Sequence, residues 1–321
     1  MQPWIDRQFG SVAAVQRQRI VRVTNLVTLD GALFNELRAK RPIEAPSGSE
    51  ELEEIIQKSA GGSFCHPEEG TPADIFGRIR GQYSLTASNV AKYDGWHGVI
   101  VFDEHHPLHL SPEQVADYIG TAQRWAQKAH EIEAEACYPF LLWNCLWKAG
   151  ASILHGHAQM TLGRGMHYAK VEAWRQAAQR YQRAYGTNYF DDLIAVHRSL
   201  DLAIEHDTAT ILPSLTPLKE KETLIVSRGL DDGLKSAIAV VLSTMIEALG
   251  VQSFNVALYQ PPIADTPESW DGFPHVARIV DRGSLQSKTA DVAAMELFGQ
   301  SIITTDPYRL ADALRETSVP R

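Results

Sequence analysis

The order strand, helix, strand, strand occurs twice along this chain of 321 residues. In the first copy the helix is clearly marked, because Ser111 is a good N-cap, Pro112 suits the first helical position and Gln114 completes a capping-box pattern. Apolar residues then recur at steps of three and four and give this helix one apolar stripe. Short apolar segments typical of strands flank the helix, at residues 99–102, 138–143 and 153–162.

The second copy repeats this order farther along the chain. It has a strand at 223–226, a helix at 231–249 that Gly250 ends, and strands at 254–259 and 276–280. Matching elements lie roughly 115 to 125 residues apart, which predicts a duplicated α+β unit. We expect a first repeat over residues 1–165 and a second over 166–321. The other expected helices are 171–185, 191–203 and 306–315.

Composition excludes two classes of protein. The longest apolar stretch, residues 236–251, is interrupted by Ser243, Thr244 and Glu247, so it cannot supply the roughly 20 apolar residues of a membrane span. A net charge of −9 and a pI near 5.7 exclude an extended groove for nucleic acid, which needs a broad basic surface. We therefore expect neither a membrane nor a nucleic acid as partner. A small phosphorylated ligand needs only a local cationic site.

Cysteine use and the N-terminal residues predict the compartment. Cys65, Cys137 and Cys145 are too few and too scattered for a disulfide framework, which fits a reducing environment. Near the N-terminus, charged residues stand where a secretory signal needs its apolar segment. We expect a cytoplasmic protein.

The expected strand at 153–162 is the segment that carries chemistry. Period-two alternation sends Leu154, Ala158, Met160 and Leu162 to one face, and His155, His157 and Gln159 to the other. Two imidazoles and an amide in register form a row that suits a phosphate or a metal. The alternative is an ordinary polar face turned to solvent.

The loop at 144–152 before this strand suits an anion. Its small residues Gly150, Ala151 and Ser152 let backbone N–H groups approach a phosphate, while Asn144 and Ser152 add polar side chains. A local basic run at 38–42 supplies positive charge elsewhere in the chain. Together these features predict a phosphate-binding site.

These residues resemble a known family. The run of Asn144, Gly150-Ala151-Ser152 and His155-x-His157-x-Gln159 resembles the histidine-triad (HIT) superfamily, and its glutamine is similar to the galactose-1-phosphate uridylyltransferase-like branch. The resemblance continues in Arg38-Ala39-Lys40-Arg41-Pro42, in Phe64-Cys65 with Glu69-Gly70-Thr71-Pro72, in Asn89 ahead of 93–101, and around Glu296. It implies two tandem HIT-like repeats, an antiparallel sheet with packed helices, and a homodimer.

The resemblance also implies roles for the matching residues. His157 attacks the α-phosphorus of a bound nucleotide, because neutral imidazole is a good nucleophile near pH 7 when a backbone carbonyl holds the proton of its other nitrogen. Gln159 cannot act as an acid or base, so it holds a phosphoryl oxygen without activating water. Ser152 binds the departing phosphate. The expected nucleotide and phosphate contacts are Arg38, Arg41, Phe64, Asn89, Asn144 and Gly150, and the expected acceptor contact is Glu296.

Three functions remain open at this point. The first is a nucleotidyltransferase that moves a nucleoside monophosphate between a nucleotide sugar and a sugar 1-phosphate. The second is a phosphorylase that uses inorganic phosphate as acceptor and acts on an ADP-sugar or a dinucleoside polyphosphate. Met295 and Ile302 favour it, since the hexose enzymes of the family have tyrosine and a polar residue there. The third is a non-catalytic nucleotide-binding protein.

The resemblance leaves the metal content open. The family's structural zinc site uses two cysteines and two histidines, and here Cys65, His106 and His155 match three of these positions, while Gly62 stands where the other cysteine would be. Closed zinc sites normally have four ligands. The proposed chemistry requires no cofactor. A second metal site of some members needs paired histidines that residues 273–278 lack, so we interpret Glu172 as a helix-surface carboxylate.

Overall fold

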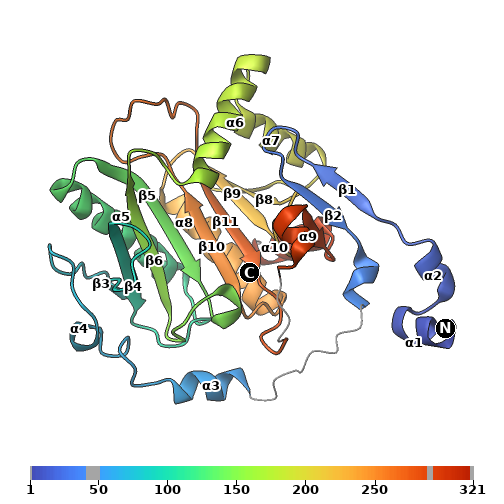
Figure 1. Cartoon of the computed structure of the whole chain (residues 1–321), viewed down its shortest axis with the longest axis horizontal. Helices are drawn as coiled ribbons and strands as arrows, with labels where there is room; N and C mark the ends of the chain where they lie inside the picture. The colour runs from blue at the N-terminus through green and yellow to red at the C-terminus, as the bar shows by residue number, and fades with distance from the viewer. Residues whose placement is uncertain (1, 41–50, 288–291, 319–321) are drawn as a thin grey trace.

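The computed structural model describes residues 2–40, 51–287 and 292–318 (Figure 1). At its centre is a nine-stranded sheet in the order β3-β4-β6-β5-β10-β11-β9-β8-β7. Every neighbouring pair of strands in this sheet is antiparallel. The strands are β3 Ser84–Ser88, β4 Trp96–Phe102, β5 Ala136–Asn144, β6 His157–Arg164, β7 Ile204–His206, β8 Ala209–Pro213, β9 Thr223–Ser227, β10 Phe254–Tyr259 and β11 His275–Asp281.

Helices α5 (Pro112–Ile132), α8 (Asp232–Ser243) and α10 (Pro307–Ser318) pack on one face of this sheet. Alternate strand residues join the buried side chains of these helices in one apolar cluster. α5 begins with the predicted capping box, since Ser111 Oγ accepts from the N–H of Gln114 and the side chain of Gln114 accepts from the N–H of Ser111. α8 continues into a π-helical turn at Thr244–Ala248.

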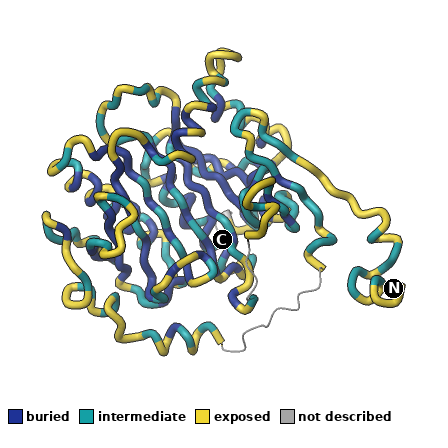
Figure 2. Tube along the Cα trace, in the orientation of Figure 1, coloured by how far each residue is buried: buried dark blue, intermediate teal, exposed yellow. Residues whose placement is uncertain are grey.

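The opposite face is covered only in part. Helices α6 (Ala169–Tyr185) and α7 (Tyr189–Ser199) pack over β8, β9 and β11 through a second apolar cluster. Over β3 and β4 the same face has only a small cluster, formed by Ala87, Val99 and Val101 with Phe64 against them. The central strands are nevertheless the most buried part of the chain (Figure 2). The surface beside β4 and β6 is therefore the part of this face that none of the described helices covers.

A smaller sheet lies beside the large one. β1 (Val21–Thr24) pairs with β2 (Gly31–Phe34), and β12 (Ser301–Ile303) runs parallel to β2. This sheet joins the start of the chain to the segment assigned to the second repeat. The remaining elements are the helices α1 Gln2–Phe9, α2 Val12–Gln16, α3 Leu52–Lys58, α4 Pro67–Gly70 and α9 Ala294–Phe298, and the short 3-10 turns η1 Glu36–Lys40 and η2 Trp147–Ala149. α1 and α2 bury none of their residues.

The observed sheet confirms the predicted α+β class. Its order is symmetric about the β5–β10 pair, because β6, β4 and β3 follow on one side and β11, β9 and β8 on the other. This symmetry agrees with the two patterns in the sequence, although the duplication itself and the boundary at 165/166 stay predictions. Among the described residues no helix has both the length and the apolar character needed to cross a bilayer.

One predicted element is shorter than expected. The strand predicted at 153–162 begins only at His157, and residues 153–156 have no regular structure. The reason is that the ladder breaks at Gly156: its carbonyl still accepts from the N–H of Phe102 at 3.0 Å, but its N–H donates to the carbonyl of His105, beyond the end of β4, at 3.1 Å. A Cβ at Gly156 would lie 2.7 Å from the Phe102 ring, so this crossing requires glycine.

Candidate active site

His157 is the first residue of β6 and lies opposite Val101 of β4. Its Nδ1 is 2.8 Å from the carbonyl oxygen of His155. A carbonyl only accepts, so Nδ1 carries the proton and Nε2 presents a lone pair. No described residue hydrogen-bonds to that Nε2. Burial lowers the pKa of His157, so the ring is neutral near pH 7 and Nε2 is poised as a nucleophile.

Phe64 packs against the reactive ring. Its ring meets His157 edge-on at a centroid distance of 5.2 Å and His155 at 6.2 Å. The same side chain rests on Val99 and Val101 of β4. Phe64 therefore shields one side of His157 from water and fixes the plane of the imidazole.

Gln159 lies on the same face of β6, two residues after His157. Its Oε1 is 2.8 Å from His97 Nε2 and 3.4 Å from Asn89 Nδ2. His97 is completely buried and comes from β4. The amide oxygen of Gln159 is thus held inside the protein.

Asn144, at the end of β5, is held by the neighbouring strand β10. Asn255 Nδ2 donates to Asn144 Oδ1 at 2.7 Å and to the carbonyl of Ala149 at 2.9 Å. Arg282 in turn donates to Asn255 Oδ1. The oxygen of the Asn144 amide is therefore occupied, and its Nδ2 is the group that faces away from β10.

The loop between β5 and β6 uses several of its own donors. The N–H groups of Ala149, Gly150 and Ala151 donate to carbonyls of Leu146 and Trp147 at 3.0–3.1 Å. Gly150 has φ +95°, a left-handed conformation that favours glycine. These three N–H groups are thus occupied, and the exposed Ser152 and the Asn144 amide remain as side-chain donors of this loop.

Three potential metal ligands, Cys65, His105 and His155, lie close together near His157. Cys65 Sγ lies 3.4 Å from His105 Nδ1 and 3.4 Å from His155 Nδ1, and the two nitrogens are 3.0 Å apart. His155 Nε2 lies 2.7 Å from the carbonyl of Phe102, and His105 Nε2 lies 3.0 Å from the carbonyl of Ile56. Each Nε2 is therefore a donor, and each Nδ1 presents a lone pair.

This arrangement fits a zinc ion. Two lone pairs 3.0 Å apart repel each other unless a cation or a proton lies between them, and the Cys65 thiol supplies only one proton. Zinc bond lengths imply tetrahedral ligand–ligand distances of about 3.3–3.6 Å, close to those observed. Backbone carbonyls that fix both imidazoles are the usual outer partners of metal-bound histidine. The described residues offer three ligands at this place and not a fourth.

The third ligand corrects the sequence-based expectation. His105 joins Cys65 and His155, whereas the expected His106 turns away. His106 Nε2 faces Glu53 at 3.2 Å, its Nδ1 accepts from the N–H of Leu108, and its ring stacks on His109. The two histidines lie in a bend after β4, where the chain directs the His105 ring to Cys65 and the His106 ring to Glu53.

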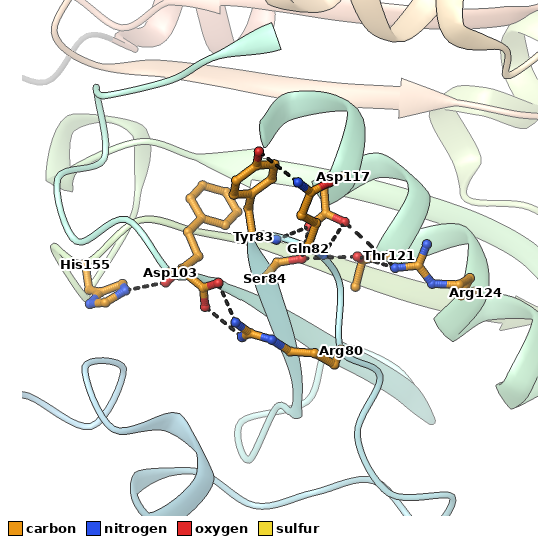
Figure 3. Close-up of polar contacts among 10 residues, drawn as sticks. Arg80, Gln82, Tyr83, Ser84, Asp103, Asp117, Thr121, Arg124 and His155 are labelled. Atoms are coloured by element: carbon orange, nitrogen blue, oxygen red, sulfur yellow. Dashed lines mark hydrogen bonds and ion pairs between the residues drawn. The ribbon is translucent and has the colours of Figure 1, made fainter. Parts of the chain in front are cut away.

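Polar contacts support the strand end that holds His155 (Figure 3). Arg80 forms a two-pronged ion pair with Asp103, directly after Phe102, with contacts of 2.7 and 2.6 Å. Nearby, Asp117 of α5 accepts from the N–H groups of Gln82 and Tyr83 at 2.9 and 3.0 Å. These contacts attach the segment before β3 to α5 and to the end of β4, whose last carbonyl accepts from His155.

Two expected phosphate and acceptor contacts lie elsewhere. Arg38 is in η1 after β2, and Glu296 is in α9 before β12, so both belong to the small sheet. Within the described residues no hydrogen bond or ion pair connects Arg38 or Glu296 to β6. Glu296 accepts from the N–H of Ala293 and caps its own helix. Arg41 lies outside the described residues.

Glu172 corrects a further expectation, since it is not a surface carboxylate. It is buried, and Arg175 contacts both of its oxygens, with Nε at 2.7 Å and Nη2 at 2.5 Å. The hydrogen bonds from Arg175 lower the pKa of Glu172. A guanidinium thus neutralises this carboxylate.

Three further residues of the site, His97, His105 and Asn255, had no predicted role. His97 faces Thr161 in the β4–β6 register and so lies diagonally from Gln159 on the same face. Asn255 lies directly opposite Asn144 in the β5–β10 register. The register between the predicted strands would have identified His97 and Asn255 as neighbours of Gln159 and Asn144.

Known structures share this fold. An ADP-glucose phosphorylase from Arabidopsis thaliana, solved with bound ADP-glucose, is similar with a TM-score of 0.73 and 19% identity over 94% of this chain and 100% of that chain. A GalT-like protein from the same plant gives 0.68 and 18% over 94% and 100%, and a uridylyltransferase gives 0.63 and 15% over 93% and 98%. No protein-family model and no curated protein sequence matches the chain. The protein has the fold that these ADP-glucose phosphorylase, GalT-like and uridylyltransferase structures share.

Proposed function

We propose that this protein is a nucleotidyltransferase that works through a covalent nucleotidyl-histidine on His157. The observation that carries the proposal is the state of the ring: Nδ1–H is held by the His155 carbonyl at 2.8 Å, and Nε2 has no partner among the described residues. A neutral imidazole in this tautomer has the nucleophilic nitrogen that attack on phosphorus requires.

Two displacements complete the reaction. Nε2 of His157 attacks the α-phosphorus of a nucleotide sugar, a nitrogen–phosphorus bond forms, and the bond from the α-phosphorus to the bridging oxygen breaks. Sugar 1-phosphate leaves as a dianion that needs little protonation, so no general acid is required. A phosphate oxygen of the acceptor then attacks the same phosphorus and releases His157. The proton stays on Nδ1 throughout, hydrogen-bonded to the His155 carbonyl.

Neighbouring side chains stabilise this phosphoryl group. Gln159 and Asn144 each have the amide oxygen bound within the protein, so each presents N–H groups to the charged oxygens. Ser152 binds the departing phosphate. Because Gln159 has no acid or base function near pH 7, it does not activate water, which favours transfer over hydrolysis.

The cluster of Cys65, His105 and His155 has a structural role in the proposed site. Cys65, His105 and His155 would hold a Zn²⁺ ion, which would supply structure by fixing His155, the residue whose carbonyl orients His157.

The acceptor defines two candidate functions. A sugar 1-phosphate acceptor gives a hexose-1-phosphate uridylyltransferase-like enzyme, with Glu296 as the contact for sugar hydroxyls. Inorganic phosphate gives a phosphorylase, which the apolar Met295 and Ile302 favour. The similarity to an ADP-glucose phosphorylase supports this second candidate. In both we propose a homodimer in which Arg38 and Glu296 of the small sheet serve the site of the other copy.

Product analysis tests these functions. Purified protein is incubated with UDP-glucose or ADP-glucose, with either inorganic phosphate or galactose 1-phosphate, and products are identified by ³¹P NMR. Formation of UDP-galactose supports the transferase. Release of glucose 1-phosphate together with a nucleoside diphosphate, only when phosphate is present, supports the phosphorylase. Binding of nucleotide without any turnover would leave a nucleotide-binding protein and contradict the proposal.

A further inference from the structure

His97 is a buried polar residue beside the candidate active site to which the proposed reaction assigns no task. Its side chain is fully buried in β4, and Tyr93 stacks on its ring at a centroid distance of 4.5 Å. A completely buried imidazole is costly unless its nitrogens have partners. Here both nitrogens have them.

The first contact fixes the tautomer of His97. The backbone N–H of Tyr93 donates to Nδ1 at 2.9 Å. A backbone N–H only donates, so Nδ1 is the acceptor and Nε2 carries the proton. Burial lowers the pKa of His97, so the second proton stays off Nδ1 near neutral pH.

The second contact fixes the amide of Gln159. His97 Nε2–H meets Gln159 Oε1 at 2.8 Å, and Asn89 Nδ2 reaches the same oxygen at 3.4 Å. The orientation of Asn89 is also fixed, because its Oδ1 accepts from the N–H of Ala91 at 2.9 Å. A rotated Gln159 amide would bring its own N–H groups against these two donors, so only one orientation is compatible.

We propose that His97 is a positioning residue that locks the Gln159 amide with Nε2 as the donor toward the transferred phosphoryl group. The inference rests on the proposed function. Without the lock, the amide would spend part of its time with Oε1 against phosphoryl oxygens, where two electron-rich groups repel. His97 acts only through Gln159, so its replacement has no effect once the amide is gone.

A matched set of variants tests this assignment. His97→Asn keeps an acceptor near the Nδ1 position and has no donor at the Nε2 position, whereas His97→Gln extends an amide donor to that position. Measurements are kcat and KM with whichever of UDP-glucose and ADP-glucose the wild-type protein uses, and thermal unfolding of every variant. His97→Phe is a second donor-free variant that keeps a ring against Tyr93, should the asparagine variant not fold.

The expected result is a loss of kcat of about 10- to 100-fold in His97→Asn with little change in KM, the scale of one hydrogen bond to a charged group. His97→Gln restores the rate to within about 5-fold. In a Gln159→Ala background His97→Asn changes kcat by less than about 2-fold, because coupled residues are non-additive.

Two other outcomes are distinguishable. Independent, multiplicative effects of His97→Asn and Gln159→Ala in an active enzyme would overturn the assignment alone, as would unchanged kcat in the donor-free variants. A folded wild-type protein that turns over neither nucleotide sugar would overturn the proposed function and, with it, this assignment.

Discussion

β6 and β11 occupy corresponding places in the two halves of the sheet, each next to a central strand. They carry different side chains on the face of the sheet that α6 and α7 partly cover. On β6 this face carries His157 and Gln159. On β11 it carries Val276 and Arg278, which lie under α6 and α7. Arg278 forms an ion pair with Glu222 through Nε at 2.8 Å and Nη2 at 2.6 Å, and its guanidinium lies over the Trp174 ring at 4.7 Å.

The difference shows that corresponding strands of one sheet can have a structural role in one half and a ligand-binding role in the other. Arg278 of β11 is paired with Glu222 within the protein and covered by α6 and α7, which is a structural use. On β6, neither His157 Nε2 nor the Gln159 amide nitrogen has a hydrogen-bond partner among the described residues. Polar groups of the second kind are prepared for a ligand, because the protein does not satisfy them.

The largest effect on stability is expected from the sealed face. Arg278→Leu leaves the fully buried Glu222 carboxylate without its cation, which lowers the free energy of unfolding by about 3–5 kcal/mol. Urea denaturation measures the loss. The double variant Glu222→Leu with Arg278→Leu recovers much of it, since no buried charge remains. A loss below about 1 kcal/mol in Arg278→Leu would contradict a structural role for this pair.

Acid should weaken the same part of the molecule. Burial lowers the pKa of His167, at the entry to α6, to about 4 from an ordinary 6.5. The unfolded chain therefore binds a proton that the folded chain does not. The free energy of unfolding falls as the pH decreases from about 6.5 to about 4, by up to about 3 kcal/mol from this residue, and His167 adds no slope outside that window.

Denaturation in urea at pH 7.5, 5.5 and 4.5 measures this slope, and His167→Gln is the matched variant without the titrating ring. We expect a shallower pH dependence in the variant. Equal slopes in both proteins would show that His167 does not resist protonation in the folded state.

The smallest effect is expected from the contact between Asn255 of β10 and Asn144 of the candidate active site. Asn255→Leu removes the donor that fixes the Asn144 amide, and we expect about a 10-fold lower rate of nucleotide-sugar turnover, the worth of roughly one hydrogen bond. Thermal unfolding monitors the fold. Ser269→Ala, on the loop beside α6, is the control with unchanged rate. An unchanged rate in Asn255→Leu would contradict the role of Asn255 in orienting the Asn144 amide.

Local signals predicted much of the fold. The capping box at Ser111 and Gln114 predicted the start of α5, and the helix predicted at 171–185 ends at the last residue of α6, Tyr185. The place where β6 begins was not predictable in this way, since the hydrogen bonds of Gly156 to Phe102 and His105 are set by the tertiary structure.

The candidate site was predictable only in outline. The histidines and glutamine of β6 stood out because alternation places them on one face. The choice of His105 over His106 depended on the approach of residues near Cys65, and the roles of His97 and Asn255 depended on strand register. Sequence spacing shows which side chains share a face, but not which neighbour holds each polar atom.

Detection of the covalent intermediate is the decisive experiment for nucleotidyl transfer through His157. Wild-type protein is mixed with UDP-glucose or ADP-glucose without acceptor, quenched in base to protect the acid-labile phosphorus–nitrogen bond, digested and analysed by tandem mass spectrometry. We predict one nucleoside monophosphate on His157, which is lost when the acceptor is added and is absent from folded His157→Gly. Turnover without any adduct, an adduct on another residue, or full activity in His157→Gly would contradict it.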